Sequence, residues 1–144
     1  MIEQDTIRLL RECDAGVKMG VASIDDVLDS VHAQPMKTML ADCKADHEKL
    51  DYEIRDALNR FQDEGKDPNP MAKAMSEMKT GMKLAMKDSD QTIADLMTDG
   101  CNMGVKSLTK YLNKYKAADE SSKDIAKRLI HLEERLAVDL RPYL

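Results

Sequence analysis

The feature that most limits the fold is a row of mainly apolar residues in the N-terminal segment, spaced alternately three and four apart. This spacing places side chains along one face of an α-helix. The row contains Ile7, Leu10, Asp14, Val17, Val21, Ile24, Leu28 and Val31. We therefore expect a helix over about residues 5–33, with Asp5 as its N-cap and one carboxylate among its buried positions.

A second row with helical spacing follows almost at once. It contains Met36, Leu40, Cys43, His47, Leu50, Ile54, Leu58 and Phe61. Pro35 suits the first turn of a helix, and Gly65, Pro68 and Pro70 lie close together beyond the row. The sequence predicts a helix from Pro35 to near Glu64, with His47 as its polar inward residue.

Two further helices are predicted in the C-terminal half, over about residues 90–117 and from the turn at 119–122 to Pro142. The inward positions of the first are Ile93, Leu96, Gly100, Met103, Leu108, Tyr111 and Tyr115, and those of the second are Ile125, Leu129, Leu132, Leu136 and Leu140. We interpret Glu133, Glu134 and Arg135 as part of a solvated face.

The segment between Pro70 and Lys87 carries five methionines on one helical face. They are Met71, Met75, Met78, Met82 and Met86, and the segment also holds four lysines against one glutamate, a local charge of +3. We expect a crossover helix over about residues 70–87, with its sulfur atoms packed on its own bundle or on a second copy. Binding of Cu(I) by the thioethers is the alternative.

Composition favours a single all-α domain over residues 1–144. The chain has one Phe and no Trp, and 42% of its residues are apolar. This mixture suits helices better than strands, which favour β-branched and aromatic residues. Four long helices with one long connection predict a bundle in which the second and third long helices run parallel.

Charge and targeting signals limit the cellular location and the partners that we expect. The N-terminus is charged too early for a secretion signal, and no apolar run is long enough to span a membrane. Three widely spaced cysteines predict free thiols rather than a disulfide framework. With a net charge of −5, the chain lacks the basic footprint of nucleic-acid binding. We expect a cytoplasmic protein.

Two short motifs, Cys13-Asp14-Ala15-Gly16 and Asp99-Gly100, together with the helix lengths, resemble a bacterial family of small ferritin-like four-helix proteins. Metal-binding members of that class hold di-iron with glutamates and Glu-x-x-His pairs. His47 and His131 do not match that pattern, because Lys44 stands three residues before His47 and Arg128 three before His131. His32 follows Asp29 at the right spacing, but it lies at the end of the first predicted helix, where a ligand would reach solvent. The sequence therefore does not predict a di-iron site.

A different metal site is conceivable between the second and third long helices. Counting residues along these helices places Cys43 and Cys101 at similar depth, with His47 about one turn away. Two thiolates and an imidazole suit Zn²⁺ or Cu(I). The alternative is that all three are core residues, with a hydrogen-bonded histidine, and then no cofactor is needed.

A second polar group follows from the same count. Asp14 falls near the level of His131, with Tyr111 close by. A buried carboxylate needs a partner, so we expect Asp14 to pair with His131 or Arg128. A structural contact is favoured over acid–base catalysis, because no nucleophile motif or phosphate loop accompanies it.

These expectations favour a non-catalytic helical bundle that acts through protein contacts on its helix faces, as a homo-oligomer. One alternative is a metal-binding or oxidoreductase-type ferritin-like protein that uses Cys and His ligands. Another is a regulatory adaptor.

Overall fold

The computed structural model describes residues 2–68, 73 and 89–144. The long helices are α1 (Ile2–Leu28), α2 (Gln34–Arg60), α4 (Asp90–Lys114) and α5 (Glu120–Leu140), and a short 3-10 helix, η1 (Arg141–Tyr143), follows. Within those ranges there is no strand, which confirms the all-α prediction. The expected crossover helix and its five methionines lie outside the described residues, apart from residue 73.

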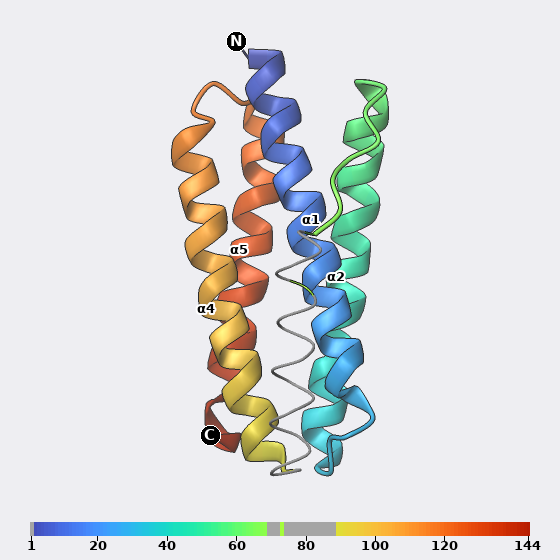
Figure 1. Ribbon diagram of the computed structural model, residues 1–144, viewed down its shortest axis with the longest axis vertical. Coiled ribbons are helices and arrows are strands. Elements are labelled where there is room, and N and C mark those ends of the chain that lie inside the picture. Colours follow the sequence, from blue (N-terminus) through green and yellow to red (C-terminus); the bar gives the residue numbers. More distant parts are fainter. Residues whose placement is uncertain (1, 69–72, 74–88) are drawn as a thin grey trace.

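The four long helices pack side by side as a bundle (Figure 1). Helix α1 contacts α2, α4 and α5, and α5 also contacts α2 and α4. Figure 1 shows α1 and α5 running in one direction and α2 and α4 in the other. The second and third long helices therefore run parallel, as the sequence predicted.

The helix ends differ from the predicted ones where side chains have other partners. Helix α1 begins at Ile2, and Asp5 lies within its first turn instead of capping it. The Asp5 carboxylate instead accepts a hydrogen bond from the backbone N–H of Ala117, which ties the α4–α5 turn to α1. Ser89 and Asp119 cap α4 and α5, because each side chain accepts a hydrogen bond from the backbone N–H three residues further on, that of Thr92 and that of Ser122.

The opposite end of the bundle is held together by Asp90. Its two carboxylate oxygens accept the backbone N–H groups of His32 and Ala33, at 2.7 and 2.8 Å. These donors belong to the turn between α1 and α2, so the turn is attached to the start of α4. Helix α1 ends at Leu28, earlier than predicted, while Val31 in the turn remains buried.

The core consists of two apolar clusters along the bundle. One cluster is centred on Leu9, Leu10, Ile54 and Leu129, and the other on Ile24, Met36, Leu40, Ile93 and Leu140. Between them lie polar residues from α2 and α5. The predicted inward rows are largely buried, but Met103 is 70% exposed, and Cys101 and Met97 are buried instead.

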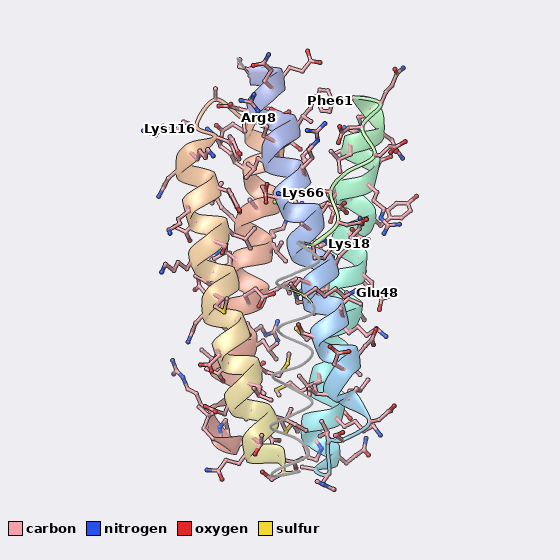
Figure 2. All side chains as sticks on the ribbon, in the orientation of Figure 1. Arg8, Lys18, Glu48, Phe61, Lys66 and Lys116 are labelled. Carbon is pink, nitrogen blue, oxygen red and sulfur yellow. The ribbon has the colours of Figure 1, made fainter. Side chains whose placement is uncertain are left out.

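The segment that follows α2 runs back along α1 (Figures 1 and 2). Helix α2 ends at Arg60, before the predicted Glu64, and Gln62 and Gly65 have positive φ values that a helix does not allow. Ion pairs join Asp63 to Arg11, Lys66 to Glu12 and Asp67 to Lys18.

None of the helices that the structure describes combines the length and apolar character needed to cross a membrane.

Candidate functional site

A buried pair of polar side chains joins α2 to α5 in the layer between the two apolar clusters. The Nε2 atom of His47 lies 3.0 Å from Oε1 of Glu133. His47 is 0% exposed and Glu133 is 8% exposed. Burial alone lowers the pKa of His47, but hydrogen bonds with Cys43 and Glu133 and the charge of Glu133 outweigh it and raise the pKa to about 10. The pair is therefore an imidazolium–carboxylate ion pair at neutral pH.

The other ring nitrogen of His47 faces its own helix. Nδ1 donates to the backbone oxygen of Cys43 at 2.8 Å and lies 3.6 Å from the Cys43 sulfur. Residues four apart on a helix share a face, which explains why these two side chains meet. Cys43, His47 and Glu133 thus form a continuous chain from the half-buried thiol to the buried carboxylate.

Glycines on the other two helices, Gly20 and Gly104, lie next to this chain of side chains. A Cβ atom at Gly20 of α1 would lie 2.8 Å from Cδ2 and 2.9 Å from Nε2 of His47. A Cβ at Gly104 of α4 would lie 3.5 Å from Cδ of Glu133, which is ordinary contact. Only at Gly20 is the absence of a side chain required by the position of the imidazole.

Cys101 lies near Glu133 from the side of α4. The pKa of the Cys101 thiol is raised by burial, by the charge of Glu133, by a hydrogen bond with Glu133 and by the charge of Cys43. Burial and the neighbouring Glu12 and Asp14 raise the pKa of Cys13 to about 12. These two buried thiols therefore stay protonated at neutral pH.

The structure brings Cys43 and His47 together, but does not assemble them with Cys101 as a metal site. Among the described residues, no group of three or more His, Cys, Asp or Glu side chains has an arrangement that could hold a metal ion. The physical reason is that His47 already uses both ring nitrogens, one on Glu133 and one on a backbone oxygen.

The predicted pair of Asp14 and His131 is wrong. Asp14 is 1% exposed, whereas His131 lies on the exposed side of α5. The alternative partner, Arg128, pairs with Glu53 and Asp124. The level count along the bundle ignored the rotation of α5 about its own axis, and that rotation turns both side chains outward.

Asp14 finds its partners in its own helix and in the segment after α2. Its Oδ2 atom accepts the backbone N–H of Lys66 at 3.0 Å and contacts Nζ of Lys18 at 2.9 Å. Gly65, next to Lys66, has φ of +86°, and a side chain there would collide with the Asp14 carboxylate. The close approach of this loop therefore depends on glycine.

Asp14 also lies near a second carboxyl group, that of Asp51. Neither Oδ1 of Asp14 nor Oδ1 of Asp51 has a hydrogen-bond partner, although both atoms are buried. The pKa of Asp51 is raised by burial and by the nearby Asp14 carboxyl group, against the opposing effect of Arg55 and Lys18. Both oxygens are therefore buried acceptors that lack a donor.

A surface groove of about 320 Å³ opens between α2 and α5 beside Cys43. Its apolar lining includes Met39, Leu132 and Leu136, which are buried or half-buried. Its charged lining comprises Asp42, Asp46, Asp139 and Arg135, of which all but the half-buried Asp46 are exposed. The groove therefore has an apolar floor and a rim with an excess of negative charge.

Sequence reasoning missed Glu133, Asp51 and the role of Gly20. Glu133 was assigned to a solvated face, yet it is four residues after Leu129 and three before Leu136. That spacing would have placed it on the inward face of α5. Asp51 carries the same signal, because it is four residues after His47 and three before Ile54, although the neighbouring Leu50 was assigned to the row.

Comparison of the chain with models of protein families, with curated proteins and with solved structures finds no match.

We expect Gly20→Ala to destabilise the protein by about 1–3 kcal/mol, because the new methyl group must displace the His47 ring. Gly100→Ala is the matched control, since a Cβ at Gly100 in α4 meets no atom within 4 Å. There the gain in helix propensity should stabilise the protein by about 0.5–1 kcal/mol. Urea unfolding measures both changes, and equal effects of the two substitutions would contradict the packing argument.

The ion pair predicts a loss of stability at alkaline pH. Because folding raises the pKa of His47 from 6.5 to about 10, its contribution is complete below pH 6.5 and is lost as the pH rises towards 10. The test is the free energy of unfolding of wild type and of His47→Gln, measured at pH 6 and at pH 9. The difference between the two proteins should be about 2–3 kcal/mol smaller at pH 9 than at pH 6. His131→Gln, at an exposed position, serves as control and should parallel wild type. A difference in the free energy of unfolding between wild type and His47→Gln that does not change with pH would exclude a charged His47.

Asp51→Asn should stabilise the protein at neutral pH by about 0.5–1.5 kcal/mol, because the amide donates permanently to Asp14. The advantage should grow as the pH rises above 3.8, the usual pKa of the carboxyl group, because the raised pKa means that ionisation of Asp51 costs the folded wild type stability. Asp14→Asn should instead destabilise by about 1.5–3 kcal/mol through its contacts with Lys18 and Lys66. Thermal unfolding across pH 4–8 distinguishes the two carboxyl groups, and a destabilising Asp51→Asn would refute the unfavourable contact between them.

Proposed function

We propose that this protein is a non-catalytic helical bundle, ferritin-like in its helix directions, that acts through contacts on its helix faces and associates with further copies of itself. We also propose a cytoplasmic location, in keeping with three free thiols. The observation that carries the proposal is the groove between α2 and α5, with its apolar floor and acidic rim.

Grooves of this kind receive the apolar face of an amphipathic helix. The groove has room for side chains such as methionine, and Met39, Leu132 and Leu136 provide apolar contacts. The rim carries three carboxylates and one guanidinium, so it favours an occupant with positive charge. A suitable occupant is thus cationic on one face and apolar on the other.

The chain carries a sequence of this chemistry between Pro70 and Lys87. Five methionines at helical spacing and a local charge of +3 complement the groove, although the chain as a whole has a net charge of −5. We therefore assign the occupant to this segment of a second copy. Attraction between unlike regions lets an acidic protein self-associate, because the oppositely charged surfaces meet while like charges stay apart.

Light scattering after size-exclusion chromatography tests this assignment. Wild type should show a mass above that of the 16.2 kDa monomer, and the double charge reversal Asp42→Lys/Asp139→Lys should weaken association by about tenfold or more. The matched control Asp56→Lys/Asp99→Lys makes the same charge change at exposed positions outside the groove. It should leave association much less affected.

A synthetic peptide of residues 70–87 provides an independent measurement, since it should compete with association and bind the groove with strong salt dependence. A wild-type monomer at all concentrations, or equal effects of the two double variants, would refute the proposal. If the peptide binds a protein that remains monomeric, the groove accepts this segment but self-association is excluded as its function.

A further inference from the structure

The three thiols of this protein lie in different surroundings. Cys13 and Cys101 are 0% and 2% exposed, and burial raises the pKa of both. Cys43 is half-buried and lines the groove between α2 and α5. A reagent in the groove can therefore contact Cys43 while the other two thiols remain covered.

A positively charged donor lies beside the Cys43 sulfur. Nδ1 of His47 is 3.6 Å from Sγ, and the charge on the ring is held in place by Glu133 at Nε2. An imidazolium next to a sulfur stabilises the negative charge that the sulfur carries as a nucleophile. Because Nδ1–H also donates to the Cys43 backbone oxygen at 2.8 Å, the ring acts on the sulfur mainly through its charge.

The rim of the groove selects among reagents by charge. Asp42, Asp46 and Asp139 outnumber Arg135, and Arg135 is itself 3.9 Å from Asp139. A cationic reagent is attracted to this rim and an anionic one is repelled. The selection acts at the entrance, separately from the activation of the sulfur by His47.

We propose that Cys43 is a thiol–disulfide exchange site that accepts small cationic disulfides through the groove between α2 and α5. The Cys43 proton leaves to water, and the thiolate attacks one sulfur of the disulfide. A new bond forms between Sγ and that sulfur, while the S–S bond of the reagent breaks. The second sulfur departs as a thiolate and takes up a proton, so Cys43 is oxidised and the reagent is reduced.

The site lies in the groove assigned above to a second copy, but it does not depend on self-association. The exchange is measured on the mass of the single chain in dilute solution, without a partner. A failure of association therefore leaves this result intact, and a failure of exchange leaves the association result intact.

Intact-mass spectrometry with peptide mapping tests the site. Native protein treated with cystamine should gain one adduct, on Cys43, and Cys43→Ser should gain none. The rate with each reagent is divided by the rate of the same reagent with free cysteine. This relative rate should be about tenfold or more higher for cystamine than for oxidised glutathione, and added salt should reduce the preference. Adducts on Cys13 or Cys101 at a similar rate, or no charge preference, would refute the proposal.

Two sets of variants separate access from activation. Asp42→Asn/Asp46→Asn should lower the preference for cystamine, whereas Asp56→Asn/Asp99→Asn, outside the groove, should retain it. His47→Gln should slow reaction with the neutral reagent 2-hydroxyethyl disulfide, which the rim does not select. Circular dichroism checks that each variant is folded, and if His47→Gln does not fold, the rim variants alone decide the result. Unchanged rates in a folded His47→Gln would show that Cys43 is merely accessible.

Discussion

The ion pair between His47 and Glu133 is the interaction around which the bundle is arranged. It lies between two apolar clusters and connects α2 with α5. Taking two charges out of water is costly, and their attraction compensates only when the geometry is good and the remaining polar atoms are satisfied. Here the second ring nitrogen donates to the Cys43 carbonyl, and Gly20 leaves space for the ring. Such a contact fixes which faces of the helices meet, because a shifted register would leave a charge buried without its partner.

The second polar contact has a different purpose in the architecture. Asp14 receives a backbone N–H from Lys66 and an ammonium group from Lys18, and so binds the segment after α2 to the middle of α1. Ion pairs of Arg11 and Glu12 with the same segment lie nearer the surface and contribute less. The chain is thereby directed back along the bundle, which parallel α2 and α4 require because α4 starts at the opposite end.

The two proposals share one surface. The groove between α2 and α5 exposes Cys43 on the outer side of the same layer in which His47 and Glu133 are buried. Chemistry at the sulfur and docking in the groove thus depend on the same helix pair. Because the ion pair joins these two helices, it also maintains the geometry of the groove.

The sequence alone determined the helices and most of their buried faces. Spacing of three and four residues must place Leu10, Ile54, Leu129 and similar residues on one side of each helix, whatever the other helices do. Turn residues and the glycine and proline cluster after α2 placed the helix ends to within about five residues, because they act locally, whereas the predicted cap Asp5 lies inside α1. The meeting of Cys43 and His47 was also local, since both lie on one face of α2.

Tertiary structure decided which polar residues meet across helices. The rotation of α5 about its axis turned Glu133 inward and His131 outward, and a level count along the bundle contains no information on that rotation. Likewise, Asp14 pairs with the backbone N–H of Lys66, in the segment after α2. Every residue except proline has such a donor, so no pattern of side chains predicts which one is used. Periodicity fixes a helix face, whereas the packing of all four helices together selects the partner that each buried charge finds.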